Sequence, residues 1–445
     1  MRPLLSLLLG FSLLGATAIA QSTNSYSSID TLLNRLDRHH KAMGSVLISR
    51  KGKVLYQRGF GEAEVGKHPN TPETVYRIGS ITKTFTSVLV FQLIEKGKLS
   101  LTDPLSRWYP AVPNAEKITI DDLLTHHSGI HNITEDADFG TWQISPKTKA
   151  QVVARIAATK PDFAPGEKAS YSNSNFILLG YIIEEATGKP YAENLRTGIT
   201  KPLGLSHTSY GGPIHPERNE ALPYGISNGA WEKDLPSNMD VPGGAGGIVS
   251  TVGDMAKFLE ALFLKHYLSE SSLQKMQTLR DQYGRGLLRF PFYGDYSWGH
   301  GGHIDNFTTM LSFFPKDSTV FSIATNALGY QFNDILIGVM SLYYGKTFEM
   351  PDFSKKIEVD AAMLKKLEGV YTCKEIGMDI TIKAEGYGIT AQATGQGAFP
   401  LEAESESVFS NNEVGVHLSF NSKDETVRGF MLSQGGSRLP FVRKD

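Results

Sequence analysis

A serine and a lysine three residues apart, Ser80 and Lys83, have the clearest chemical potential in the sequence. On a helix, positions i and i+3 share one face, so the two side chains can touch. A lysine can take the serine proton when burial keeps its amine neutral, and a helix N-terminus favours developing negative charge. Ser272 and Lys275 repeat the spacing in a polar stretch, whereas Ser80 opens a strongly apolar one. Ser80 is therefore interpreted either as a nucleophile or as a helix N-cap.

Two further patterns follow Ser80 at wide spacing. Tyr171-Ser172-Asn173 offers a phenol for proton transfer and an amide to orient a substrate, although Ser and Asn are also common in turns. In His300-Gly301-Gly302-His303 the glycines let a substrate approach the backbone, and His300 adds a donor or a titratable group. The catalytic candidates are therefore Ser80, Lys83, Tyr171 and His300, and the substrate-binding candidates are Asn173, Gly301, Gly302 and His303.

In this order, the three patterns resemble those of the serine β-lactamase-like hydrolase superfamily. That superfamily holds class C β-lactamases, D-alanyl-D-alanine carboxypeptidases, D-aminopeptidases and esterases. The flanking residues 76–79, 97–104 and 123–130 agree, and the likeness covers residues 28–345. Three motifs in the right order are jointly far more specific than any one of them.

The resemblance implies a role for each candidate. Ser80 would be acylated and Lys83 would activate it. Tyr171 would pass a proton to the leaving group and later help to activate water, while Asn173 would bind the amide of the substrate. The oxyanion would lie between the backbone N–H groups of Ser80 and His303.

His300 is a departure from the β-lactamases of this group, which carry a lysine at that position. A histidine with an ordinary pKa is mostly neutral at pH 7, so the site loses a fixed positive charge. We expect Tyr171 to be less acidic and a substrate carboxylate to be held less firmly. This difference favours peptides, amides or esters over β-lactams.

The expected function is that of an exported serine hydrolase that forms an acyl-enzyme at Ser80. Its favoured substrates are amide or peptide bonds of D-amino-acid type, as for a carboxypeptidase or aminopeptidase. An esterase or weak β-lactamase on the same residues is the alternative, and a catalytically silent peptide- or glycan-binding protein is the alternative from another class. No cofactor is expected, and a metal site is disfavoured because no histidine lies in a His-Glu-x-x-His helix. The histidines considered were His126, His127, His131, His300 and His303.

The composition of the chain excludes several other classes of protein. The 445 residues include 44 Lys and Arg against 46 Asp and Glu, and 40% are hydrophobic. A net charge of −2 without basic blocks gives no footprint for nucleic acid. The expected partner, a small peptide, amide or ester substrate, is the one that the resemblance implies. The single cysteine, Cys373, excludes an intramolecular disulfide.

The first twenty residues have the pattern of a secretory signal peptide. A positive start at Arg2 precedes an apolar run over 4–14, and Ala18-Ile19-Ala20 fits the cleavage pattern. The apolar run is shorter than the roughly 20 residues that span a bilayer. We therefore expect a periplasmic or secreted protein whose mature chain has no transmembrane segment.

The mature chain reads as two domains. Helices are expected over 28–43, 80–97 and 332–344, with strands at 45–49 and 54–56 and a hairpin within 307–325. This order predicts an α/β (α+β) fold, in which helices flank an antiparallel sheet and a helical insertion separates its two halves. We assign the hydrolase domain to 21–345, a linker to 346–358 and a small all-β domain, a barrel or sandwich, to 359–445.

Overall fold

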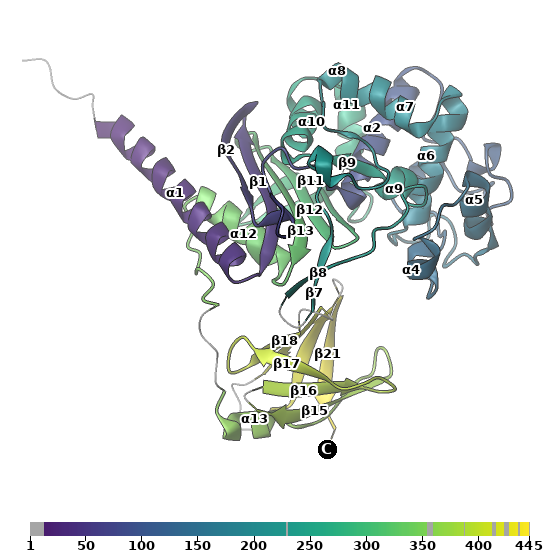
Figure 1. Ribbon diagram of the computed structural model, residues 1–445. Coiled ribbons are helices and arrows are strands. Elements are labelled where there is room, and N and C mark those ends of the chain that lie inside the picture. The colour runs from purple at the N-terminus through teal and green to yellow at the C-terminus, as the bar shows by residue number, and fades with distance from the viewer. Residues whose placement is uncertain are drawn as a thin grey trace, which may run out of the picture. The chain divides into compact units, whose positions relative to one another are not determined.

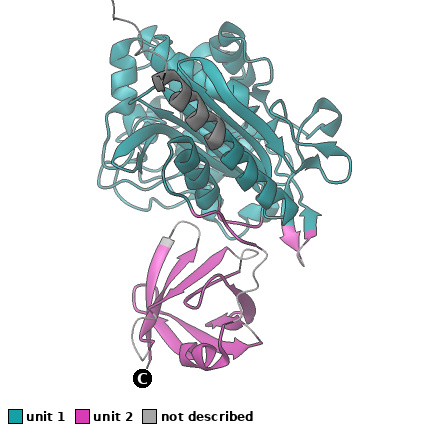
Figure 2. Ribbon diagram, turned by 90° about the vertical axis from the view of Figure 1, so that its left-hand side faces the viewer, with its two compact units in different colours: residues 1–225, 231–328, 332–348 teal, residues 226–230, 329–331, 349–445 magenta. Residues whose placement is uncertain are grey.

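The computed structural model describes residues 13–227, 230–353, 359–386, 388–411, 415–421, 427–434 and 437–444. The described chain forms two compact units, shown in Figure 2. The larger unit comprises the described residues up to 225 together with 231–328 and 332–348. The smaller unit comprises residues 226–230, 329–331 and the described residues from 349 onward. Each unit has a hydrophobic core of its own.

An antiparallel sheet is the central layer of the larger unit (Figure 1). Strand β1 pairs with β13 on one side and with β2 on the other, which joins the two ends of this unit's sequence. Because nearly every residue of β1 is buried, this strand has core on both faces. The prediction of one antiparallel sheet is confirmed. Its main path runs β10 (Leu288–Phe292), β11 (Asp295–Ile304), β12 (Phe307–Phe314), β13 (Thr319–Leu328), β1 (Ala42–Arg50) and β2 (Lys53–Phe60).

Helices cover both faces of this sheet (Figure 1). Helix α1 (Leu13–Arg38) and helix α12 (Phe332–Tyr343) pack together on one face. Helices α2 (Thr82–Glu95) and α10 (Val252–Leu264) lie on the other. Helix α1 ends five residues before the predicted Met43, because His40 adopts a positive φ of 50° and β1 begins at Ala42.

A helical region occupies the sequence between β2 and β10, as expected. Helix α6 (Asn173–Thr187) is apolar and mostly buried, and it packs against α2. Two small sheets join this region to the rest of the unit: β3 (Glu62–Glu64) with β4 (His68–Pro69), and β5 (Tyr76–Arg77) with β9 (Ile248–Ser250) and β6 (Ser209–Tyr210). Two short strands, β7 (Tyr224–Ser227) and β8 (Ala230–Lys233), pair with each other. The other helices are α3 (Ile120–Leu124), α4 (Phe139–Trp142), α5 (Lys149–Ala158), α7 (Tyr191–Leu195), α8 (Lys201–Leu203), α9 (Gly243–Gly246) and α11 (Glu270–Gln277).

The smaller unit is a closed β-barrel preceded by helix α13 (Ala361–Leu367). Aromatic rings fill its interior, among them Tyr371, Phe420 and Phe430, whose centroids lie 4.9–6.0 Å apart. The predicted all-β domain is confirmed and is a barrel rather than a sandwich. Its strands are β14 (Gly369–Cys373), β15 (Met378–Glu385), β16 (Gly388–Ala393), β17 (Phe399–Ala403), β18 (Val408–Asn411), β19 (Val416–Phe420), β20 (Gly429–Gln434) and β21 (Ser437–Arg443).

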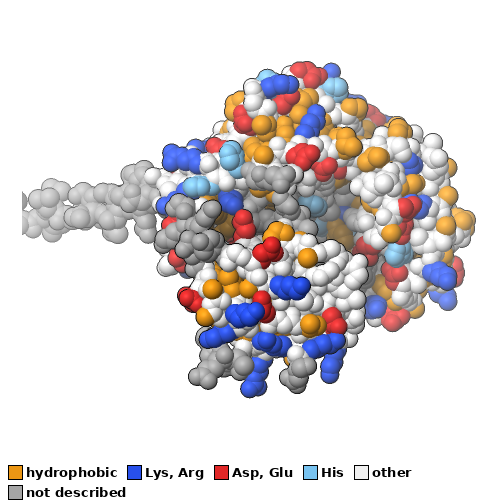
Figure 3. Space-filling view, turned by 60° about the horizontal axis from the view of Figure 1, so that its bottom comes forward, with side chains coloured by type: hydrophobic (Ala, Val, Ile, Leu, Met, Phe, Trp, Pro, Cys, Tyr) orange, Lys and Arg blue, Asp and Glu red, His pale blue; other side chains and the backbone are white. Residues whose placement is uncertain are grey.

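The two remaining segment predictions fall partly outside the described residues. Residues 346–353 of the predicted linker carry no helix or strand, and residues 354–358 are not described. Residues 1–12 of the predicted signal peptide are also outside the description, and residues 13–20 belong to α1. None of the described helices is both long and apolar enough to cross a membrane. On the face in Figure 3, acidic and basic side chains are intermixed, in keeping with the small net charge.

Candidate active site

Ser80 lies in a short 3-10 turn, Gly79–Ile81, between β5 and helix α2. The residues at the N-cap positions of the turn and of α2 are Ile78 and Ile81, so the interpretation of Ser80 as an N-cap is wrong. Gly79 has a φ of 50°, and a Cβ there would lie 2.7 Å from the backbone nitrogen of His303. A glycine is therefore required for the turn to lie against strand β11.

Lys83 is the second residue of α2 and is completely buried, and its Nζ makes three hydrogen bonds of 2.8 Å. Burial lowers the pKa of Lys83 well below its ordinary value, which favours the neutral amine. Two partners, the Asn173 Oδ1 and the Ala245 carbonyl, can only accept hydrogen bonds. The two N–H bonds of a neutral amine satisfy these acceptors, so its lone pair is directed at Ser80 Oγ. Lys83 is thus arranged as a base for that hydroxyl.

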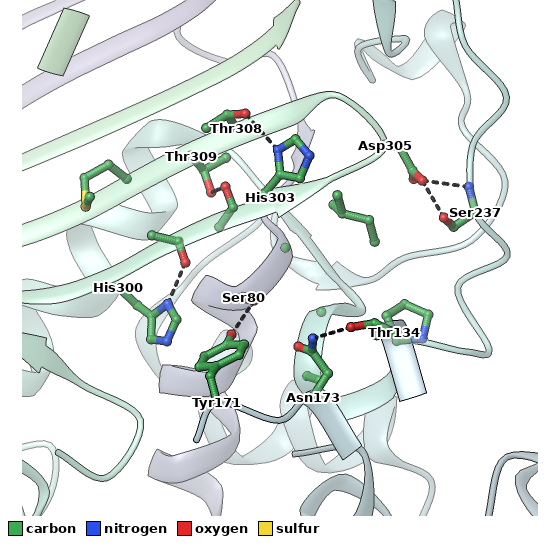
Figure 4. A pocket seen from close by; sticks show the side chains of 18 of the residues that line it. Ser80, Thr134, Tyr171, Asn173, Ser237, His300, His303, Asp305, Thr308 and Thr309 are labelled. Carbon is green, nitrogen blue, oxygen red and sulfur yellow. Dashed lines mark hydrogen bonds between the residues drawn. The ribbon is translucent and has the colours of Figure 1, made fainter. Parts of the chain in front are cut away.

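Tyr171 approaches the same hydroxyl, with its phenol oxygen 2.8 Å from Ser80 Oγ (Figure 4). Burial raises the pKa of Tyr171, so the phenol keeps its proton and donates it to Ser80. A chain of hydrogen bonds therefore runs from Tyr171 through Ser80 to Lys83. The structure brings together these three predicted residues from two distant segments.

His300 lies on β11 beside the phenol, with its ring centroid 6.4 Å from that of Tyr171. Burial lowers the pKa of His300 to about 3. Its Nδ1 donates to the Gly301 carbonyl at 2.5 Å, which leaves the lone pair on Nε2. The imidazole is therefore neutral at pH 7. With histidine in place of the lysine of the β-lactamases, this position has no positive charge.

Asn173 is the first residue of α6, and both ends of its side-chain amide make hydrogen bonds within the protein. Its Oδ1 accepts from Lys83, and its Nδ2 donates to Thr134 Oγ1 at 3.0 Å and to Asn132 Oδ1 at 3.3 Å. These contacts orient the lysine. Both Nδ2 hydrogens are used, but Oδ1 accepts only from Lys83, so its second lone pair can accept a hydrogen bond from a substrate amide N–H.

The predicted glycines of β11 differ in their surroundings. A Cβ at Gly302 would lie 2.0 Å from the Ile78 carbonyl oxygen, so this glycine permits contact between two backbone segments. At Gly301 the nearest atom to an added Cβ is 3.6 Å away, on Met310, so the strand is open there. The imidazole of His303 bonds through Nδ1 to Thr308 Oγ1 at 3.0 Å. The segments that carry both predicted oxyanion donors, Ser80 and His303, are thus packed directly on one another.

An ion pair that sequence reasoning missed lies at the end of β11. Arg77 donates to Asp305 at 2.5 Å, and the other Asp305 oxygen accepts from the backbone N–H of Ser237 at 3.0 Å. The Ser237 hydroxyl also bonds to this carboxylate (Figure 4). Arg77 belongs to the motif before Ser80, but the sequence carried no signal that Asp305 would be its partner.

These residues surround a cavity of about 710 Å³. None of the described residues that line it is a lysine or an arginine, and its one carboxylate, Asp305, is paired with Arg77. The cavity therefore has a neutral, largely apolar wall. The apolar lining residues are Phe139, Ile177, Pro242, Ala245, Leu288, Phe290, Ile304, Met310 and Phe332.

The other histidines considered for a metal are hydrogen-bonded within the protein. His127 bonds to the Thr125 carbonyl and to Asp281, and His131 lies between Asp136 and Asp162. Throughout the described parts of the chain, no group of three or more His, Cys, Asp or Glu is placed to hold a metal ion.

A serine contacted by a buried amine and by a phenol, on a turn packed against strand β11 of an antiparallel sheet, defines a serine hydrolase of the β-lactamase and penicillin-binding type. The family model described as Beta-lactamase matches residues 29–338, so the chain belongs to that family. It is a serine hydrolase.

Two curated relatives illustrate the similarity. Penicillin-binding protein 4* of Bacillus subtilis (strain 168) is 26% identical over 449 residues, covering 94% of this chain and 99% of the relative. Teichoic acid D-alanine hydrolase of Staphylococcus aureus (strain NCTC 8325 / PS 47) is 29% identical over 328 residues, covering 70% of this chain and 79% of the relative.

Two solved structures have the same fold. The octameric penicillin-binding protein homologue from Pyrococcus abyssi has a TM-score of 0.65 at 26% identity and covers 94% of this chain and 99% of its own. The D-amino acid amidase from Ochrobactrum anthropi SV3, complexed with D-phenylalanine, has a TM-score of 0.64 at 25% identity. It covers 72% of this chain and 99% of its own.

Proposed function

We propose that this protein hydrolyses amide bonds of D-amino-acid derivatives through an acyl-enzyme at Ser80. The observation that carries the proposal is the contact of one hydroxyl oxygen with both the Lys83 amine and the Tyr171 phenol, each at 2.8 Å. A D-amino acid amidase and a D-alanine hydrolase among the similar proteins support the substrate class.

Acylation begins with proton transfer from Ser80 Oγ to the lone pair of Lys83. The oxygen forms a bond to the substrate carbonyl carbon, and the resulting oxyanion lies between the N–H groups of Ser80 and His303. Donors of this kind each contribute about 10²–10³ in rate. The carbon–nitrogen bond then breaks as Tyr171 gives its proton to the leaving amine, and the Lys83 ammonium returns a proton to the phenolate.

Deacylation reverses the direction of proton flow. A water molecule transfers a proton to Lys83 with the help of Tyr171 and attacks the ester carbon. Collapse of the second tetrahedral intermediate releases the acid and returns the proton to Ser80 Oγ. One amide and one water are consumed, one acid and one amine are formed, and every side chain regains its starting protonation state.

The charge of the cavity favours substrates without a free carboxylate beside the scissile bond. His300 is neutral, and the Asp305 charge is balanced by Arg77, so the described lining offers no free cation to pair with such a carboxylate. We therefore place amides before carboxy-terminal peptides. Uncharged esters are the second candidate substrate, because the same neutral wall accommodates them.

We also propose that the chain is exported. The proposal is based on the pattern over residues 1–20, and cleavage after Ala20 would leave Gln21 as the new N-terminus. Expression of the full chain followed by mass analysis of the extracytoplasmic fraction tests it. An intact N-terminus on all of the protein would contradict cleavage.

Covalent labelling tests the acyl-enzyme. A serine-reactive phosphonate or β-lactam should add its mass to the peptide that contains Ser80, and Ser80→Ala should abolish the addition. D-amino-acid amides, their L-enantiomers, p-nitrophenyl esters and a chromogenic β-lactam then rank the substrates. Preference for esters or the β-lactam would favour the alternative hydrolases, and no labelling by any probe would favour a silent binding protein.

A further inference from the structure

We propose that His126 is a positioning residue that holds the Tyr171 phenol in place for proton transfer. His126 lies on the loop after α3, is 3% exposed and does not touch Ser80 in any hydrogen bond that the structure shows. Its role would be exerted through Tyr171. This inference depends on the proposed function, because it assumes that Tyr171 transfers protons.

His126 contacts the tyrosine segment in three ways. The carbonyl of His126 accepts from the backbone N–H of Ser170 at 2.9 Å, and its Nδ1 accepts from the backbone N–H of Ser172 at 3.1 Å. The residues on both sides of Tyr171 are thereby fixed to one residue. Its imidazole also stacks on the phenol ring, with centroids 4.5 Å apart and an interplanar angle of 29°.

The backbone of His126 is adapted to this task. Its φ is 60°, in the left-handed region that side chains other than glycine seldom adopt. In this conformation the carbonyl and the ring of one residue reach two N–H groups that lie two positions apart. Such strain persists only where the surrounding structure enforces it, and here the ring is also packed against Tyr283 and Phe176.

The hydrogen-bond pattern requires a neutral imidazole. Since Nδ1 accepts from Ser172, a proton on that atom would remove the acceptor and turn the N–H of Ser172 away. Burial lowers the pKa of His126, which favours the neutral ring, and the hydrogen bond from Ser172 selects the tautomer with its proton on Nε2. Tyr171 is therefore held from behind by an uncharged ring while its hydroxyl faces Ser80.

His127 supplies a matched control in the next position. It is also buried, at 2% exposure, but its ring bonds to Thr125 and Asp281, and the described structure shows neither a hydrogen bond nor a ring contact between it and Tyr171. Loss of a buried histidine in general should affect both positions alike. Loss of the phenol's support should affect only His126.

The test compares variants that keep one contact each. His126→Asn keeps an acceptor for Ser172, and Asn tolerates a positive φ, but it loses the stacked ring. His126→Phe keeps the ring and loses the acceptor. We expect each to lower kcat for a D-amino-acid amide about tenfold to a hundredfold with little change in KM, since small misplacement of a catalytic group has this effect. His127→Asn should leave kcat within about twofold.

A double-mutant cycle with Tyr171→Phe makes the result decisive. If His126 acts only through the phenol, its substitution should cost no more than about twofold once the phenol is gone. An undiminished loss in the Tyr171→Phe background, or an equal loss in His127→Asn, would overturn the inference while leaving the proposed function intact. Full activity of Tyr171→Phe alone would overturn both. The thermal unfolding of each variant is measured first. Each kcat is then calculated per mole of folded protein, so that a loss of folded protein is not counted as a loss of activity.

Discussion

Arg77 and Asp305 form a buried ion pair that joins the segment before Ser80 to the turn after His303. Their side chains are 2% and 4% exposed, and the nitrogen–oxygen distance is 2.5 Å. Arg77 precedes Ser80 by three residues, and Asp305 follows His303 by two. The pair therefore holds the two predicted oxyanion donors at a fixed separation.

Removal of the carboxylate should be costly. Asp305→Ala leaves the Arg77 charge buried without its carboxylate, and we expect the free energy of unfolding to fall by about 3–5 kcal/mol. Asp295→Ala is the control, because its partner Lys316 is 60% exposed and such a surface pair contributes about 0–1 kcal/mol. Urea titration of both variants measures the difference. Equal effects would contradict a structural role for the buried pair.

The two glycines of β11 should respond differently to alanine. Gly302→Ala forces a methyl group to within 2.0 Å of the Ile78 carbonyl, so we expect a loss of about 1–3 kcal/mol in stability and a loss of activity. Gly301→Ala meets no atom closer than 3.6 Å and should fold normally. Its methyl group would obstruct substrate beside the strand, which raises KM. Thermal melting and Michaelis–Menten kinetics separate the two outcomes.

The neutral His300 should make the protein sensitive to acid. Its pKa is about 3 in the folded protein against 6.5 in the unfolded chain, so between these values only the unfolded state binds the proton. The free energy of unfolding then falls as pH falls through this range, by up to about 1.4 kcal/mol per pH unit. For His300→Gln, we expect the loss between pH 7 and pH 5 to be about 2 kcal/mol smaller than in the wild type. Parallel curves for the two proteins would refute the assignment.

A permanent cation at position 83 should abolish the base. Lys83→Arg can still donate to Asn173 and Ala245 but has no lone pair at any accessible pH. We expect acylation of Ser80 to slow by at least about 10²-fold, the lower range for general-base catalysis. The rate of phosphonate labelling followed by mass spectrometry measures this step directly. Labelling at the wild-type rate would mean that another group accepts the serine proton.

Introducing a lysine at position 300 tests whether the neutral His300 disfavours substrates that carry a carboxylate. His300→Lys places an amine beside Tyr171, which should acidify the phenol and attract substrates that carry a carboxylate. We expect β-lactam turnover to rise relative to turnover of uncharged amides by about tenfold, the effect of roughly one charge-assisted hydrogen bond. The alkaline limb of the pH profile should also move to lower pH. An unchanged substrate ratio and an unchanged limb would count against the argument.

The elements near the site could be predicted because each has a local signal. The apolar run after Ser80 specified α2, and the hairpin predicted within 307–325 corresponds to β12 and β13. The individual barrel strands have weaker local signals, because β14, β17 and β18 are only four or five residues long and Pro440 lies within β21. Closure of the barrel is a property of strand pairing, which no single segment encodes.

The site residues likewise fall into those that have a local sequence signal and those that only the fold brings to the site. Ser80, Lys83 and Tyr171 were found because their types and spacing carry chemical meaning. Asp305 and Phe290 were missed because a carboxylate in a turn and a phenylalanine in a strand are ordinary residues until the fold places them at the cavity. The hydrogen bond from Lys83 to the Ala245 carbonyl had no side-chain signal at all, since any residue supplies that oxygen.

The proposed nucleophile depends on groups contributed by residues 83, 171, 245 and 300–305, so the complete site forms only when these distant parts of the chain have packed together. A partly folded chain could have the serine and the lysine on one turn, but it would lack the burial that keeps the amine neutral and the phenol beside the hydroxyl. The amount of a serine-reactive probe that binds covalently should therefore equal the amount of correctly folded protein. In a refolding mixture this measurement would replace a separate assay of conformation.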